Sequence, residues 1–394
     1  MSRMMVLGTL LCSVMISCEK ENTDFSVKVM ERPVTTEVSV NYTGNRAPLK
    51  PLNFIKLPVG DIQPKGWLKK YLLLQKPKTH TAGDRIMRYD ITALGEILID
   101  FTPSGSDAAG DLIFARKAGG APVNLLATVS KFGGKTAFIG KVGNDMFGSF
   151  LRETLKNAGV SDEGLITDNL HNTTLAFVAL NSEGDRDFSF YRNFGADVFL
   201  EKEDINADII KNSRIFHFGS LSLTAEPARS TTEYALDIAK KAGCTVTYDP
   251  NYREPLWKDK ATAIEMMKLH LDKVDILKIA KDELLMLFGG REESAVKAVF
   301  SYGVKIILVT DGAKGAALYM KNAHIALPAE KVNTIDTTGA GDIFFGTFLS
   351  EWINNKSTAY NITPETAEKY LKKAIYVAGK STKKHGAISA LKEI

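Results

Sequence analysis

Residues 333–346 read Asn333-Thr334-Ile335-Asp336-Thr337-Thr338-Gly339-Ala340-Gly341-Asp342-Ile343-Phe344-Phe345-Gly346, a glycine-rich turn that opens an apolar helix. At a helix N-terminus the free amides of Gly339, Ala340 and Gly341 form an anion site, and phosphate is the expected guest. The Asp342 carboxylate can take a proton from a hydroxyl while the amides hold charge on a phosphoryl oxygen. Taken alone, the motif also fits an ordinary strand-to-helix turn in which Asp342 balances the helix dipole.

A second glycine turn precedes another predicted helix, in Lys117-Ala118-Gly119-Gly120-Ala121-Pro122-Val123-Asn124. Gly119 and Gly120 would let sugar hydroxyls reach backbone amides, and Asn124 can both donate and accept hydrogen bonds. Asp100 ends the first predicted strand, at the edge where open α/β sheets bind ligands, although a solvated strand end is an equal alternative. The two turns together predict one shared cleft.

The pattern from Tyr89 onward alternates strands with helices, which predicts a three-layer, Rossmann-like α/β fold with a mostly parallel sheet. Strands are expected at Tyr89–Phe101, Thr136–Val142, Arg214–Gly219, Thr245–Asp249, Asp275–Ile279 and Lys305–Thr310. Helices are expected at Pro122–Phe132, Asp145–Asn157, Pro227–Lys241, Lys258–Leu271 and Lys281–Phe288. Thr174–Leu180 and Asp187–Tyr191 break the alternation, because the polar turn at 181–186 indicates a β-hairpin, which we expect to act as a small lid.

Residues 87–394 resemble the PfkB, or ribokinase-like, carbohydrate kinases, and especially the fructokinases of that family. Two family signatures occur in order, Gly119–Asn124 and Asp336–Asp342. Supporting stretches are Gly95–Phe101, Gly140–Asp145, Tyr191–Asn193 and Tyr248–Arg253. A chance match of both signatures is much less probable than a match of either one alone.

The resemblance implies a role for each matching residue. Asp342 would be the catalytic base, the amides of Gly339, Ala340 and Gly341 would steady the phosphoryl group, and the sugar would be bound by Asp100, Gly119, Gly120, Asn124 and Arg192. Thr310, Gly312 and Gly315 resemble an adenine-nucleotide contact, Thr382 and Gly386 would shape the nucleotide site, and Asp336 and Thr338 would help hold a monovalent cation such as K⁺. ATP and Mg²⁺ are implied, with Glu283 beside the ion.

Some positions depart from the family pattern. Ala280 stands where many relatives carry Asn or another polar residue, so Glu283, or Asp282 beside it, would do more of the work of orienting Mg²⁺. Asp311 replaces a commonly apolar residue in the nucleotide turn, and Ser389 stands where fructokinases often have proline. None of these changes removes the base or the anion site.

The first 86 residues differ in composition from the rest of the chain. An apolar run from Met4 to Ile16 ends before Cys18, which suggests a lipoprotein-type signal at 1–18, and residues 49–76 resemble the start of a secreted glycosidase. The net charge of +4 comes entirely from residues 1–86, so we expect no nucleic-acid partner. We therefore expect an appended, largely irregular segment at 19–86 and a kinase domain at 87–394.

The expected reaction is transfer of the γ-phosphoryl group of ATP to a primary hydroxyl of fructose. A ribokinase, a nucleoside kinase and a 2-keto-3-deoxygluconate kinase remain alternatives. A dinucleotide-dependent oxidoreductase lacks its glycine fingerprint here, and a surface lipoprotein or glycan-binding module would leave the kinase signatures unexplained. We expect a cytoplasmic homodimer, with a membrane partner only if the signal segment is functional. Because an export signal conflicts with a kinase that needs ATP from the cytoplasm, we interpret the chain as a fusion of two unrelated sequences.

Overall fold

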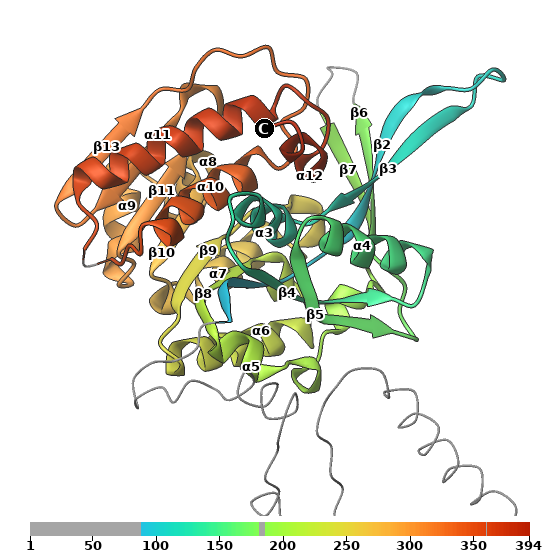
Figure 1. Ribbon diagram of the computed structural model, residues 1–394, viewed down its shortest axis with the longest axis horizontal. Coiled ribbons are helices and arrows are strands. Elements are labelled where there is room, and N and C mark those ends of the chain that lie inside the picture. The colour runs from blue at the N-terminus through green and yellow to red at the C-terminus, as the bar shows by residue number, and fades with distance from the viewer. Residues whose placement is uncertain (1–87, 181–185, 360) are drawn as a thin grey trace, which may run out of the picture. The chain divides into compact units, whose positions relative to one another are not determined.

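A computed structural model describes residues 88–180, 186–359 and 361–394; the expected segments 1–18 and 19–86 and the tip of the predicted hairpin lie outside them. Strands and helices alternate along this part of the chain (Figure 1). Among the described helices, none has the length and apolar character needed to span a membrane.

The main sheet of the described chain has nine strands in the order β13-β12-β11-β10-β9-β8-β1-β4-β5. They are β1 (Tyr89–Leu94), β4 (Thr136–Gly143), β5 (Val160–Asp168), β8 (Ser213–Gly219), β9 (Thr245–Asp249), β10 (Ile276–Ala280), β11 (Ile306–Thr310), β12 (Ala316–Met320) and β13 (Ala323–Leu327). Neighbours from β5 to β11 pair in parallel, and β12 and β13 continue the sheet antiparallel. The mostly parallel sheet is therefore confirmed.

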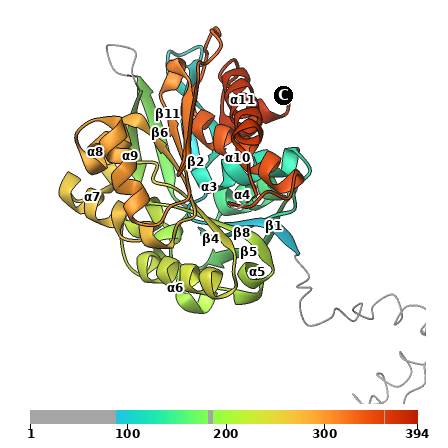
Figure 2. The same cartoon turned by 90° about the vertical axis from the view of Figure 1, so that its left-hand side faces the viewer.

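Helices cover both faces of this sheet, because its strands are apolar on both sides. One face packs against α3 (Ala121–Lys131), α4 (Met146–Asn157), α10 (Ala340–Asn354) and α11 (Pro364–Ser381). The other packs against α6 (Ala228–Lys241), α7 (Lys260–Lys268), α8 (Lys281–Phe288) and α9 (Glu292–Ser301). Figure 2 shows the two helical layers on either side of the sheet. Two short helices, α5 (Ala207–Lys211) and α12 (Ala387–Leu391), complete the described helices.

Helix α10, which the glycine turn opens, is apolar almost all the way round. Phe344, Phe345, Phe348 and Trp352 are all buried, since α10 packs against α3 and α11 as well as the sheet. Such a helix cannot shift easily, so it holds the residues of its first turn in place.

The lid is larger than the predicted hairpin. Strands β6 (Leu175–Leu180) and β7 (Arg186–Tyr191) form the expected antiparallel pair, but β2 (Leu98–Ser106) and β3 (Leu112–Gly119) extend it to a four-stranded sheet in the order β3-β2-β6-β7. This sheet projects from the rest of the domain (Figure 1). The lid is thus confirmed, and its extent is corrected.

The expected single strand Tyr89–Phe101 is wrong. The chain leaves the main sheet after Leu94, crosses at Gly95–Ile97 and enters the lid sheet as β2. Asp100 therefore lies within the lid and not at the carboxyl end of a main-sheet strand. The expected helix Lys258–Leu271 is also shorter, because it ends at Lys268 and a 3-10 turn follows.

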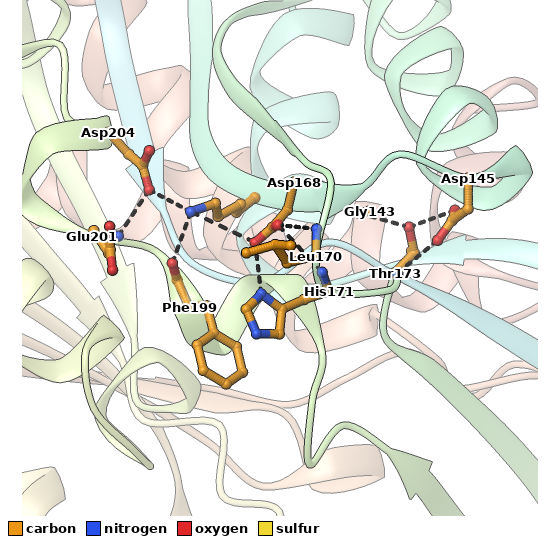
Figure 3. Close-up of polar contacts among 10 residues, drawn as sticks. Gly143, Asp145, Asp168, Leu170, His171, Thr173, Phe199, Glu201 and Asp204 are labelled. Atoms are coloured by element: carbon orange, nitrogen blue, oxygen red, sulfur yellow. Dashed lines mark hydrogen bonds and ion pairs between the residues drawn. The ribbon is translucent and has the colours of Figure 1, made fainter.

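A polar network links the segments before and after the lid hairpin to β4 and to the start of α4 (Figure 3). Nζ of Lys141 in β4 lies 2.8 Å from the Asp204 carboxylate and 2.9 Å from the Phe199 carbonyl, both beyond the lid hairpin. Before the hairpin, Thr173 donates its amide and hydroxyl to Asp145 at 2.8 Å. These contacts therefore tie the segments on both sides of the hairpin to the rest of the domain.

Candidate active site

A cavity of about 390 Å³ opens where the lid meets the amino ends of α3 and α10. The lid contributes Leu98, Asp100 and Phe190 to its lining, and α10 with the turn before it contributes Thr338, Gly339 and Asp342. Gly120 and Asn124 line it from the start of α3. The two glycine turns of the sequence thus share one cavity, as expected.

Asp342 and Asn124 meet directly inside this cavity. Nδ2 of Asn124 donates to Oδ2 of Asp342 at 2.8 Å, and both side chains are buried. Burial raises the pKa of Asp342, while the Asn124 hydrogen bond and the charges of Lys278 and Arg253 lower it. A buried carboxylate with a raised pKa and one fixed donor is suited to accept a proton.

The amino end of α10 has the geometry of an anion site. Gly339 caps the helix with φ 72°, in the left-handed region that glycine tolerates. The Ala340 amide donates to the Thr337 carbonyl at 3.2 Å, so this amide already has an acceptor. The amides of Gly341 and Asp342 follow in the first turn, where helix geometry supplies no acceptor, and they can bind an anion.

Asp100 lies on β2 beside the second glycine turn. Its carboxylate closely approaches Gly119 on β3, leaving no room for a side chain at that glycine. Burial raises the pKa of Asp100 to about 6. A carboxylate in this position can accept hydrogen bonds from sugar hydroxyls when it is ionised.

Two charged residues of the cavity lining were not singled out from the sequence. Glu96, in the crossing between β1 and β2, accepts the Ala121 amide at 2.9 Å, and burial raises its pKa to about 7. Arg253 also lines the cavity, and its charge lowers the pKa of both Asp100 and Asp342. In the sequence, these residues were included only in the stretches Gly95–Phe101 and Tyr248–Arg253, which support the family resemblance.

Arg192 is placed at the junction of the lid with the main domain. Its guanidinium donates to Asp197 at 2.7 Å, to the Thr224 hydroxyl at 2.7 Å and to the Leu221 carbonyl at 3.0 Å. The side chain is buried, so it is no solvated surface arginine. Its expected closure over the sugar stays a prediction, because the recorded contacts hold it beside the cavity.

The residues expected at the nucleotide are not among those that line this cavity. Thr310 ends β11, and Gly312 and Gly315 flank a short 3-10 turn that follows it. Thr310 pairs with Ala280 of β10, which precedes α8. Glu283 of α8 accepts the Ala280 amide at 3.0 Å and the Tyr252 amide at 2.6 Å.

Asp336 connects the turn before α10 to the end of the chain. Its carboxylate accepts the Thr338 amide at 2.8 Å and the Gly386 amide at 2.9 Å. The Thr382 carbonyl accepts the amides of Ile335 and Asp336 at 2.7 and 3.0 Å. Asp336, Thr338, Thr382 and Gly386 are therefore brought together as expected.

No cluster of three or more His, Cys, Asp or Glu side chains suited to a metal ion occurs in the described part of the chain.

The fold and this site together define a sugar kinase of one known family. The model of the pfkB family carbohydrate kinases matches residues 89–394, and the chain belongs to this family. It is 44% identical to the probable fructokinase-5 of Arabidopsis thaliana over 66% of this chain and 81% of the relative.

Two solved fructokinases share the fold. The enzyme from Xylella fastidiosa with bound ATP has a TM-score of 0.71 and 30% identity, over 77% of this chain and 95% of that one. The enzyme from Vibrio cholerae O395, in a form with fructose, ADP and calcium ion, has a TM-score of 0.70 and 31% identity, over 78% and 96%.

Proposed function

We propose that this carbohydrate kinase transfers the γ-phosphoryl group of ATP to the primary hydroxyl of fructose, giving fructose 6-phosphate. The observation that carries the proposal is the Asn124–Asp342 hydrogen bond at the anion-binding end of α10. The similarity to fructokinases, one of them solved with fructose and ADP, supports fructose as the sugar.

In the proposed reaction each of these groups has one part. Asp342 accepts the proton of the sugar hydroxyl while the oxygen of that hydroxyl bonds to the γ-phosphorus. The bond from this phosphorus to the bridging oxygen of ATP breaks, and ADP is released. The amides of Gly341 and Asp342 steady the negative charge on the transferring group. Asp100 accepts hydroxyl hydrogen bonds and orients the sugar.

The proposal includes Mg²⁺ bound with the nucleotide phosphates. Each oxygen of the Glu283 carboxylate accepts one backbone amide and keeps lone pairs, so Glu283 fits a water of the hydrated ion. Mg²⁺ would neutralise phosphate charge when bound. Asp336 and Thr338 are proposed to help hold a monovalent cation such as K⁺, which dependence of turnover on K⁺ would test.

A substrate panel tests the reaction. ADP release is measured with fructose, ribose and 2-keto-3-deoxygluconate, each with wild type and with Asp342→Asn. We expect fructose to give the highest kcat/KM and the variant to lose this activity. Preference for another sugar would replace fructose in the proposal, and sugar-independent ATP hydrolysis would contradict sugar kinase activity.

We also propose that residues 87–394 form the catalytic domain and that it works in the cytoplasm. A fragment of these residues should melt cooperatively and keep the kcat of the full chain. Mass spectrometry of the native product gives a second test. A mature N-terminus at Met87 supports the proposal, whereas a lipidated Cys18 on a chain that contains kinase peptides contradicts it.

A further inference from the structure

Behind the amino end of α10 lies a buried ion pair that the proposed reaction does not use. Nζ of Lys278 in β10 lies 2.9 Å from Oδ2 of Asp249 in β9, and both side chains are buried. Oδ1 of Asp249 has no hydrogen-bond partner among the described residues. Burying two charges is costly, and apolar residues would often serve a sheet as well, so this pair calls for an explanation beyond stability.

The position of Lys278 supplies such an explanation. A side-chain carbon at Gly341 would lie 2.8 Å from Nζ of Lys278, so the ammonium lies against the residue whose amide opens the anion site. A Cβ at position 341 would therefore require the ammonium to shift. The positive charge adds to that of the helix N-terminus at the place where phosphoryl charge would develop.

More carboxylates than basic side chains lie around Asp342. The charged groups recorded around Asp342 are Lys278 of β10, Arg253 of the loop after β9, Asp100 of β2 and Asp249 of β9, and its neutral partner is Asn124 of α3. Glu283 of α8 adds a further carboxylate beside the lysine. Without Lys278 this buried group of acids would favour a protonated Asp342.

Lys278 keeps its charge despite its burial. Burial alone would lower the pKa of Lys278, but the carboxylates of Asp249 and Glu283 outweigh it, and the pKa is raised. The raised pKa favours the charged ammonium.

We propose that Lys278 is a positioning residue for phosphoryl transfer, whose ammonium supplies a fixed positive charge beneath the amino end of α10 and favours both ionised Asp342 and the incoming phosphoryl oxygens. Asp249 holds the ammonium in place. The inference rests on the proposed role of Asp342 as the base.

The test is the pH dependence of kcat in Lys278→Gln, which keeps a hydrogen-bond donor but removes the charge. We expect kcat to fall by about tenfold or more. The acid limb of the profile should move to higher pH by about one unit, since a carboxylate without its cation binds protons more tightly. The sugar KM should change little. Lys305→Gln serves as the control and should leave kcat and the limb unchanged, because it breaks the pair between the partly exposed Lys305, just before β11, and the buried Asp275, just before β10.

A double variant separates catalysis from folding. Lys278→Gln with Asp249→Asn replaces the ion pair by two amides that can bond to each other, so it should fold even if the single variant does not. Slow turnover in this folded variant supports the inference, whereas wild-type turnover, or an unmoved acid limb in Lys278→Gln, overturns it. Asp342→Asn distinguishes the two proposals. If Asp342→Asn is active, the role of Asp342 as the base is contradicted. If Asp342→Asn is inactive but Lys278→Gln is fully active, only the role of Lys278 is contradicted.

Discussion

The side-chain amide of Asn124 donates to the Asp342 carboxylate at 2.8 Å, although 218 positions separate the two residues in the sequence. Each residue lies in the first turns of a helix that begins with a glycine turn, and the two helices α3 and α10 pack against each other. One hydrogen bond therefore joins the proposed sugar-binding turn to the proposed base. It fixes the carboxylate and also lowers its pKa.

Asp342→Asn should reduce kcat by about 10²–10⁴-fold while the KM values for sugar and ATP change much less. The amide keeps the shape of the side chain but cannot accept the proton, so the loss appears in the transition state. Steady-state kinetics measures both constants. Asp237→Asn, an exposed partner of Lys273, is the matched control and should behave as wild type. If Asp342→Asn keeps more than about a tenth of wild-type turnover, Asp342 only balances the helix dipole.

Asn124→Leu should shift the acid limb of the kcat profile to higher pH by about one unit. The Asn124 hydrogen bond stabilises the charged carboxylate, so its loss raises the pKa of Asp342 and less of the base is ionised at a given pH. The readout is kcat measured from pH 5 to 9, a range of about four units around neutrality. A limb that stays in place would show that Asn124 does not tune the base.

The sequence was sufficient for the parts of the fold that depend on local pattern. The buried parallel strands are short apolar runs, and the two glycine turns precede helices with clear start signals, so both were predicted. The lid was only half predicted, because β3, Leu112–Gly119, is largely exposed and carries Arg116 and Lys117 without a clean alternation. β2 was missed as a separate strand because it follows β1 after a crossing of three residues.

The missed site residues share one physical cause. Glu96, Arg253 and Lys278 interact with residues far away in the sequence. Local residue spacing does not predict such interactions. Glu96, for example, falls inside the expected strand Tyr89–Phe101, whereas the chain leaves the main sheet at Gly95. Lys278 lies within an apolar strand, and its ion-pair partner is Asp249 on the neighbouring strand.

Asp100→Ala should raise the sugar KM more than it lowers kcat, because the proposed hydroxyl contacts already exist in the ground state. In wild type the sugar KM should rise as the pH falls through about 6, since burial sets the pKa of Asp100 near that value and only the ionised form accepts from two hydroxyls. Asp100→Asn should have a sugar KM that is independent of pH in this range. A wild-type KM that stays constant from pH 7 to 5, about two units, would remove Asp100 from sugar binding.

The chain should form a homodimer through the lid sheet, because β3 and β7 are its open edges and carry exposed apolar side chains. Leu112 is 58% exposed and Tyr191 66% exposed. Leu112→Glu should convert the dimer to a monomer in light scattering coupled to gel filtration. Leu170→Glu, at another exposed apolar residue that lies outside the lid strands, should remain dimeric. A wild-type monomer at micromolar concentration would contradict the proposal.

Gly120→Ala should destabilise the protein by about 3 kcal/mol or more, through both backbone strain and steric overlap. Gly120 has φ 117°, and an added Cβ would lie 2.5 Å from the Glu96 carbonyl, which cannot move without shifting the crossing between β1 and β2. Gly133, just beyond the other end of α3, is the control, because it has φ 88° but nothing within 4 Å of an added Cβ. Gly133→Ala should therefore cost only the strain, about 1 kcal/mol. Chemical denaturation measures both free energies of unfolding, and equal losses would show that the close approach of Gly120 to Glu96 does not constrain the start of α3.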